Sequence, residues 1–252
     1  MNSNNHKAPR LFLNLPLAES LLPLDEQQAH YLRRVLRLKP GDAIVVFNGA
    51  GEERLAVVQT LTRHKAALAT GESLEVLPES PLNLTLIQSL VKADAMDLIV
   101  QKATELGVSS IIPVTTDFSV VRLDSERASR RMIHWQRIAR SACEQSGRHQ
   151  PPVIHGPVSL SGCLAGLPDR TTKFVLHPGS AQSLEAAANA SPDETRVAIL
   201  IGPEGGLSSA DRKLAATAGF LAVTLGTRTL RTETAALVAC SFAQLYWGDL
   251  SN

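Results

Sequence analysis

The chain of 252 residues is poor in cysteine and aromatic residues, and it contains no long apolar run. Its three cysteines, Cys143, Cys163 and Cys240, are far apart and form no CxxC pair, which argues against a disulfide framework and a thiolate zinc site. No apolar run approaches the roughly 18 to 20 residues that span a bilayer. The start, MNSNNHKAPR, is polar and lacks the apolar core of a secretion signal. We therefore expect a cytoplasmic protein without a membrane segment.

The common phosphate and metal motifs are also missing. There is no GxGxxG that opens a helix, no GxxxxGK[ST], no HExxH and no GxSxG. The seven histidines are scattered without the spacing of metal ligands. We expect no bound metal, and the missing phosphate-loop lysine argues against an enzyme that uses nucleoside triphosphates.

Charge is nearly balanced overall, with 25 Lys and Arg against 24 Asp and Glu, but the basic residues are clustered. Between His30 and Lys39 there is no acidic residue, and from Arg122 to Arg148 seven arginines stand against three acids. Such clusters are typical of proteins that contact a phosphate backbone at defined places. Each cluster alone fits an ordinary solvated helix face. Two of them together favour a polyanionic partner.

Residues 1–72 are expected to form a β-rich, barrel-like module. Apolar β-branched runs flank Asn48-Gly49, which is a strong hairpin signal. The segment DEQQAHYLRRVLRL, residues 25–38, predicts a short amphipathic helix that ends at Pro40-Gly41. A compact module that carries this basic helix suits either nucleic-acid binding or a purely structural appendage.

The rest of the chain alternates strands with helices. Strands are predicted over 82–91, 109–115, 173–177, 197–201 and 221–226, and helices over 94–108, 125–146, 181–190, 209–219 and 232–248, with a shorter helical piece near 159–167. This alternation predicts an α/β domain with a mostly parallel sheet covered on both faces. Ligands of such sheets bind beyond the carboxyl ends of the strands. That rule selects three loops: 177–181, 202–208 and 226–234.

The second of these loops lies in LIGPEGGLSSAD, residues 200–211. Glycine loops after strands often bind phosphate through bare backbone N–H groups, but the carboxylate of Glu204 would repel phosphate. The loop suits an adenosine-bearing ligand, or it is simply a turn that needs positive φ. Ser208 is expected to cap the next helix, with Asp211 completing a variant of the capping box.

The third loop lies in LGTRTLRTETAALV, residues 225–238. It places Arg228 and Arg231 between a strand and a helix, with Thr232 as the expected N-cap. Two arginines in a short loop are also compatible with an exposed ion-pair group of little energetic value. Because both loops are expected at the same edge of the sheet, their convergence favours a shared site.

The helix predicted over 125–146 carries polar residues at spacings of 3, 4 and 4 along one face: Arg137, Arg140, Glu144 and Arg148. Trp135, Ala139 and Ala142 suit the buried side of the same helix. An arginine–glutamate pair at this spacing usually lies on the exposed surface of a helix and has no specific function. A glutamate among arginines is also suited to accept a proton beside an RNA site.

Four segments in this order resemble the RsmE family of the SPOUT superfamily: KADAMDLIVQKATELGVSSIIPV, RIARSACEQSGR, LIGPEGGLSSAD and LGTRTLRTETA. The resemblance covers most of the chain from about residue 83 onward, and residues 1–72 are similar to the PUA-like RNA-binding domain of that family. Leu207 and Thr227 stand where an aromatic residue and a proline are more usual. These two departures concern the packing of the loops.

The resemblance implies an α/β fold with a SPOUT-type knotted, mostly parallel sheet, and an N-terminal β-barrel-like PUA-like domain. Residues 73–252 would form the SPOUT methyltransferase domain, with a trefoil knot in its C-terminal part. The implied protein is a homodimer that binds S-adenosylmethionine and methylates N3 of one uridine in 16S ribosomal RNA, within the small ribosomal subunit. Topology rules alone would exclude the knot.

The resemblance, the chemistry of the reaction that it implies and the basic clusters together suggest roles for single residues. The cofactor pocket would comprise Leu176, His177, Ile201, Gly202, Pro203, Glu204, Gly205, Gly206, Leu225, Gly226, Leu230, Arg231 and Thr234. Arg231 would stabilise negative charge on the uracil carbonyl oxygens, with Glu204 or Glu144 as proton acceptor. The expected RNA contacts are Arg33, Arg34, Arg37, Arg137, Arg140, Arg148 and Arg228.

Three other functions stay open at this point. A non-catalytic RNA-binding assembly factor would use the basic helices but leave the glycine loop without a role. A metabolic nucleotide enzyme would be at odds with the absent phosphate motifs and the basic clusters. A related methyltransferase acting on ribose or on another base is the nearest alternative.

Overall fold

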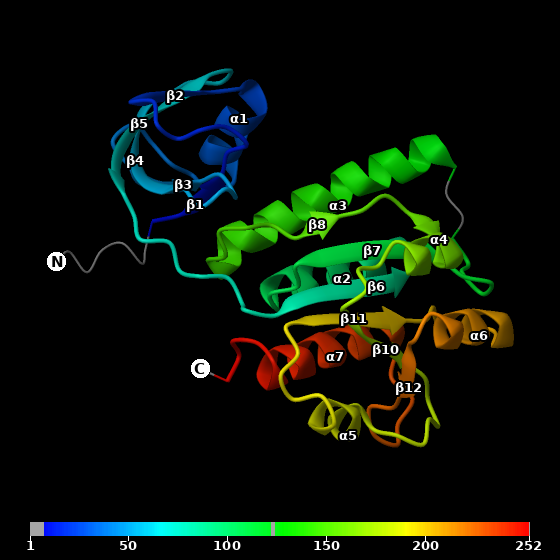
Figure 1. Ribbon diagram of the computed structural model, residues 1–252. Coiled ribbons are helices and arrows are strands. Elements are labelled where there is room, and N and C mark those ends of the chain that lie inside the picture. Colours follow the sequence, from blue (N-terminus) through cyan, green and yellow to red (C-terminus); the bar gives the residue numbers. More distant parts are fainter. Residues whose placement is uncertain (1–7, 122–123, 252) are drawn as a thin grey trace. The chain divides into compact units, whose positions relative to one another are not determined.

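The computed structural model describes residues 8–121 and 124–251, which form two compact units (Figure 1). The first unit comprises the chain up to Glu79 together with Cys143–Gln150, and the second comprises Ser80–Ala142 and the chain from Pro151. The expected boundary at residue 72 falls inside a strand, β5 (Ala66–Ser73), so the first unit extends beyond it. Arg122, which begins the second basic cluster, lies outside the described residues.

The first unit is built on a five-stranded sheet in the order β1-β3-β4-β5-β2. Its other strands are β1 (Arg10–Phe12), β2 (Leu21–Leu24), β3 (Ala43–Phe47) and β4 (Glu53–Leu61). Only β1 and β3 pair in parallel, and the other neighbours are antiparallel. Leucine, valine and isoleucine side chains fill its core, including Leu22, Ile44 and Leu68. The predicted β-rich module is therefore present.

The basic helix of this unit, α1 (Glu26–Arg34), begins at a capping box. The Asp25 carboxylate accepts from the Gln28 backbone N–H at 2.8 Å, and the Gln28 side chain accepts from the Asp25 N–H at 3.0 Å. These two bonds satisfy donors that a helix start leaves free. Ala29 and Leu32 bury one face of the helix, and its last turn carries the half-buried Arg33 and the exposed Arg34.

The second unit is built on a parallel sheet in the order β12-β10-β11-β6-β7-β8, with β9 also paired to β7. The strands are β6 (Asn83–Ser89), β7 (Ser110–Thr115), β8 (Val153–Ile154), β9 (Val158–Ser159), β10 (Thr172–Leu176), β11 (Arg196–Ile201) and β12 (Leu221–Val223). Every pairing in this sheet is parallel. The predicted α/β domain is confirmed.

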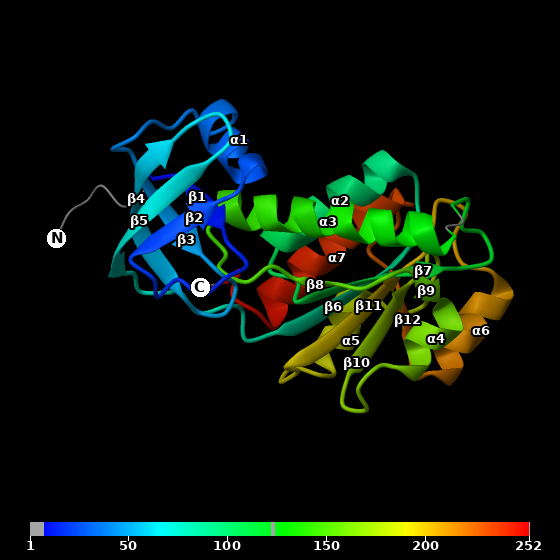
Figure 2. The same ribbon diagram turned by 90° about the horizontal axis from the view of Figure 1, so that it is seen from above.

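Helices cover both faces of this sheet (Figure 2). The helices α2 (Ala93–Glu105), α3 (Ser125–Ser146), α5 (Leu184–Asn189) and α7 (Thr232–Tyr246) share one buried cluster with the sheet. The helices α4 (Leu160–Ala165) and α6 (Ser209–Thr217) share the other. In β11, Val197 and Ile199 belong to the first cluster and Ala198 and Leu200 to the second, as the alternation of a strand buried on both faces requires.

Parallel strands place all their carboxyl ends at one edge of the sheet, and the loops that follow β10, β11 and β12 meet there. Among the described residues, no helix is long and apolar enough to cross a membrane. The same residues contain no group of three or more histidine, cysteine, aspartate or glutamate side chains arranged to hold a metal ion.

Candidate functional site: a pocket at the carboxyl ends of the parallel strands

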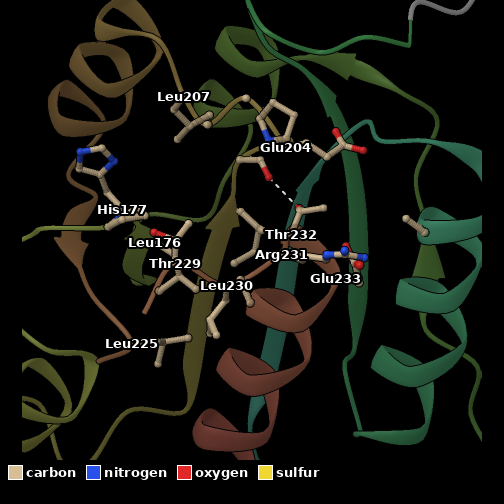
Figure 3. Close-up of a pocket in the computed structure, with 18 of the residues that line it drawn as sticks. Leu176, His177, Glu204, Leu207, Leu225, Thr229, Leu230, Arg231, Thr232 and Glu233 are labelled. Carbon is tan, nitrogen blue, oxygen red and sulfur yellow. Dashed lines mark hydrogen bonds between the residues drawn. The ribbon is translucent and has the colours of Figure 1, made fainter. Parts of the chain in front are cut away.

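A pocket of about 870 Å³ opens at this edge of the second unit (Figure 3). The loops after β10, β11 and β12 line it, together with the first turns of α2 and α7. The three loops that the strand-end rule selects from the sequence are therefore brought together in one cavity. Its volume lies within the range of about 300 to 1,000 Å³ that is usual for small-molecule sites.

The glycine loop after β11 is tightly folded. The backbone N–H of Gly206 donates to the Pro203 carbonyl at 2.8 Å, and Gly206 has φ +75°, which favours glycine. A Cβ atom on Gly202 would stand 3.1 Å from Cγ of Leu207 and 3.3 Å from the Gly206 carbonyl carbon. The conformation of the loop itself therefore requires glycine at positions 202 and 206, independently of any ligand.

A buried polar chain joins the glycine loop to the start of α7. The Thr232 hydroxyl donates to the Gly202 carbonyl at 2.8 Å (Figure 3). The same hydroxyl accepts from Nε2 of Gln88 at 3.1 Å. Gln88 lies at the end of β6 and is fully buried. The sequence prediction of Thr232 as the N-cap is wrong, because Arg231 occupies that position and makes no side-chain capping bond. The Thr232 hydroxyl instead fixes the loop.

The charged side chains of the pocket face its open side. Glu204, Arg228 and Arg231 are exposed, and their side chains make no hydrogen bond or ion pair with any residue in the described part of the chain. In Figure 3 the side chains of Glu204 and Arg231 extend to the same side of the pocket, whereas His177 lies on the opposite side. Four further charged residues line the cavity: Lys92, Asp94, Arg212 and Glu233. The pocket thus offers both a carboxylate and a guanidinium for a ligand.

The opposite wall is mainly apolar. Leu176 and Leu225 are partly buried and pack against the core of the domain, and Ile201 is buried. At the rim, the imidazole Nε2 of His177 lies 2.9 Å from Nη1 of Arg212, so the ring accepts from the guanidinium. This bond ties the loop after β10 to α6. An apolar wall of this kind suits the flat face of a heterocycle.

The pocket contains most of the residues predicted to bind the cofactor. Leu176, His177, the run from Ile201 to Gly206, Leu225, Leu230 and Arg231 all line it. Gly226 and Thr234 are not among its lining residues. Arg228, expected to contact RNA, lines the pocket as well.

Sequence reasoning missed several lining residues, among them Lys92, Asp94, Thr229 and Thr232. A signal existed for the first two, because they follow β6, whose carboxyl end lies at the same edge of the sheet. No glycine-rich loop follows β6, so the prediction from the strand ends included only the loops after the three later strands.

Glu144 has a different environment from the one expected. Its carboxylate belongs to the first unit, where one oxygen accepts from the Phe12 backbone N–H at 3.0 Å and the other from the Tyr31 hydroxyl at 2.9 Å. Burial raises the pKa of Glu144, and these two hydrogen bonds and Arg10 oppose the shift. Glu144 does not line the pocket. Its contacts hold the first unit together.

Arg148 is likewise engaged inside the first unit. Arg148 is not on the helix, because α3 ends at Ser146 as predicted and Arg148 follows it. The Arg148 guanidinium pairs with Glu79 at 2.7 Å and is only 13% exposed, and its carbonyl accepts from Arg10. Arg148 is therefore a structural ion-pair partner. The other predicted RNA contacts on helices, Arg34 and Arg137, are exposed, as is Arg37 after α1, whereas Arg33 and Arg140 are half-buried.

Comparison with known proteins decides the family. A family profile described as "RNA methyltransferase domain" matches residues 78–244. The chain is 30% identical over 247 residues to a protein of Buchnera aphidicola named ribosomal RNA small subunit methyltransferase E, covering 97% of this chain and 99% of that protein. The chain belongs to the RsmE family of RNA methyltransferases. A Bacillus subtilis member of the same name is 31% identical over 220 residues, or 85% of this chain and 86% of that one.

Two solved structures are similar to this protein over almost the whole chain. A small subunit methyltransferase E from Neisseria gonorrhoeae bound to S-adenosylmethionine superposes with a TM-score of 0.88 at 36% identity, over 96% of this chain and 99% of that one. A putative methyltransferase from Legionella pneumophila, in complex with the same cofactor, gives 0.91 at 34% identity, over 97% and 100%. A second profile, "RNA methyltransferase PUA domain", matches residues 24–69 of this RsmE-family chain, within its first unit.

Proposed function

We propose that this protein transfers a methyl group from S-adenosylmethionine to N3 of a specific uridine in 16S ribosomal RNA. One observation carries the proposal: the glycine loop and the TRTLRTE segment converge on a single pocket at the carboxyl ends of a parallel sheet. Family membership supports the reaction class, and the two relatives described with S-adenosylmethionine support the cofactor.

The residues of the pocket fit this cofactor. Partly buried leucines on one wall suit an adenine ring, and the tight glycine loop leaves backbone groups free to bond with it. Asp94, Glu204 and Glu233 provide carboxylates for a ligand that carries a sulfonium and an ammonium group. Glu204, which is incompatible with a phosphate, is electrostatically compatible with such a cation. We assign the binding role to the lining residues, with Gly226 and Thr234 outside that set.

The residues on the open side of the pocket suit the chemistry of uracil. When bound, S-adenosylmethionine supplies a methyl group that is already activated on a positively charged sulfur. The protein then has to align the uracil and favour loss of its N3 proton, which places negative charge on the flanking carbonyl oxygens. The unpaired guanidinium of Arg231 is suited to stabilise that charge. Glu204 is the proposed proton acceptor, because both oxygens of Glu144 are already engaged.

The proposed partner is ribosomal RNA, contacted by the exposed arginines of both units, Arg34, Arg37, Arg137 and Arg228, with the half-buried Arg33 and Arg140 beside them. A substrate of this kind implies a cytoplasmic enzyme. We also propose a homodimer with the trefoil knot of the SPOUT superfamily. Exposed apolar side chains on two helices support a dimer: Leu98 on α2 is 39% exposed, and Val238 and Leu245 on α7 are 42% and 53% exposed.

The deciding experiment is methyl transfer from labelled S-adenosylmethionine to small ribosomal subunits purified from cells that lack the modification. Naked 16S RNA runs in parallel, and the labelled nucleosides are separated. Label in 3-methyluridine is the expected result. Label in a different nucleoside would place the enzyme on another target. No label, with the cofactor bound normally, would show that the substrate is wrong, and failure to bind the cofactor would favour a non-catalytic RNA-binding factor.

A further inference from the structure

Phe118 stands apart from the other aromatic residues. The chain has six phenylalanines, two tryptophans and two tyrosines, all of which lie in the described ranges 8–121 and 124–251. Nine of these ten are buried or half-buried, whereas Phe118 is 52% exposed. Because its ring is half in solvent, Phe118 contributes little to the packing of the core. The exposure of Phe118 needs another reason.

The turn that carries Phe118 is held rigidly. Thr116 and Ser119 are both buried, their hydroxyls lie 3.0 Å apart, and the Ser119 N–H donates to the Thr116 carbonyl at 3.1 Å. Phe118 sits at the corner between them. It is therefore presented by a fixed turn.

A second set of bonds fixes the same turn to α6. The Asp117 backbone N–H donates to Oδ2 of Asp211 at 3.2 Å, and the Ser208 hydroxyl donates to the Asp117 carboxylate at 2.6 Å. Asp211 is buried and completes the capping box with Ser208. The residues that start α6 after the glycine loop thus also position the turn after β7.

This turn lies beside the pocket. A Cβ atom built on Gly205 would meet Cβ of Phe118 at 3.4 Å, so the phenylalanine packs on the glycine loop. Gly205 itself lines the pocket. Phe118 therefore places a half-exposed ring beside the glycine loop, at the border of the site.

We propose that Phe118 is the stacking platform for an unstacked pyrimidine base of the RNA, either the target uracil or its immediate neighbour. This inference rests on the function proposed above. A base whose N3 is to be methylated must leave both the base stack and its base pair. An aromatic side chain can replace the stacking that the base loses. Exposed Lys92 and Arg228 line the adjoining pocket and suit the phosphates on either side of that base. The unpaired cations of the adjoining pocket favour RNA over a protein as the partner.

The first test reads the contact directly, without methyl transfer. In a Phe118→Trp variant, the new indole is exposed, whereas the native Trp135 and Trp247 are 2% and 8% exposed. Hexauridylate added in the presence of S-adenosylmethionine is expected to quench the emission of the variant and to leave that of the wild type almost unchanged. A hexamer of abasic ribose phosphates is the control of equal charge. Quenching by both oligomers alike, or by neither, would overturn the proposal.

The second test uses methyl transfer to small subunits. Phe118→Ala and Phe118→Leu are expected to lower kcat/KM about 5- to 150-fold, the factor equivalent to about 1 to 3 kcal/mol for one stacked base. Phe118→Tyr should retain most of the activity, and S-adenosylmethionine affinity should not change. Leu221→Ala is the matched control, because Leu221 is 42% exposed and does not line the pocket.

The outcomes separate the two proposals. If the wild type is active and Phe118→Leu is equally active, the ring is not needed and the stacking role is wrong. If Phe118→Ala dissociates a dimer in sedimentation experiments, the ring is a contact between subunits. If the wild type methylates no RNA, the proposed function fails, and quenching by hexauridylate still decides whether Phe118 binds a base.

Discussion

The hydroxyl of Thr232 donates a hydrogen bond of 2.8 Å to the carbonyl of Gly202, and this bond joins two of the segments that line the pocket, the glycine loop and the start of α7. The first residue of α7 is thereby fixed to the first residue of the glycine loop. Since Thr232 is only 5% exposed, the bond is shielded from water and is worth more than one at the surface. The position of Arg231, its neighbour in the chain, depends on this connection.

Replacing Thr232 with valine should therefore weaken both the fold and the site. Valine has almost the same shape but leaves the Gly202 carbonyl and Nε2 of Gln88 without this partner. We expect the free energy of unfolding to fall by about 1 to 3 kcal/mol, the cost of an unsatisfied buried polar group. Chemical denaturation measures this loss, and calorimetry should show weaker binding of S-adenosylmethionine. Thr232→Ser keeps the hydroxyl and is the control. Equal stability of the valine variant and the wild type would show that the bond contributes nothing.

Arg231→Ala should reduce turnover far more than RNA binding. The guanidinium has no partner among the described residues, so its removal costs the fold little. Although Arg231 is the N-cap residue of α7, its side chain makes no capping hydrogen bond that alanine would lose. Loss of one donor to a developing oxyanion typically lowers kcat about 10²- to 10³-fold. Steady-state methyl transfer and RNA affinity are measured side by side. Arg231→Lys keeps the charge but loses the planar fork of donors, so it should recover only part of the rate. A variant that turns over normally but binds RNA weakly would reassign Arg231 to docking.

Glu144→Gln should change the pH dependence of stability. Burial raises the pKa of the folded-state carboxyl above its ordinary value, so the folded protein binds this proton more tightly than the unfolded chain does. Stability from this group is fully present below the unfolded pKa of about 4.3 and is lost as the pH rises through the raised pKa. Glutamine cannot titrate, although its amide oxygen still accepts from the Phe12 N–H. The variant should therefore lose this downward slope.

Urea denaturation at a series of pH values above about 4 measures that slope. Glu126→Gln is the matched control, since Glu126 lies on the same helix with a side chain that is 78% exposed. The control should follow the wild type throughout. Identical slopes for Glu144→Gln and the wild type would contradict a raised pKa.

Much of the second unit could be predicted because each element carries its own signal. The continuous apolar run in residues 197–201 predicts β11, and Ser208 with Asp211 predicts the start of α6, which the structure confirms. The strand β2 escaped prediction, since it is four residues long and contains Pro23, which is tolerated because the strand lies at the sheet edge. The two-residue strands β8 and β9 are too short for any periodic signal.

The errors at the site have a different cause. Spacing alone placed Glu144 and Arg148 on one charged face, yet the last turn of α3 belongs to the first unit, where Tyr31 and Glu79 engage them. Partners separated by 113 and 69 residues leave no trace in local periodicity. For the same reason, the bond from Gln88 to Thr232, across 144 residues, could not be foreseen.

The three cysteines should be unreactive in the folded protein. Burial raises the pKa of Cys143 and Cys240 to about 12 and that of Cys163 to about 11, so almost no thiolate is present near neutral pH. At pH 8, a disulfide reagent such as Ellman's should react with the native protein on the order of 10²-fold more slowly than with the unfolded chain, because only the thiolate attacks. Cys163, which has the least raised pKa and is 6% exposed against 0% for the others, should react first. The urea-unfolded protein, in which all three thiols react, is the control. If a thiol of the native protein reacted within seconds, its segment would have to open to solvent, because a buried thiol with a raised pKa does not react that fast.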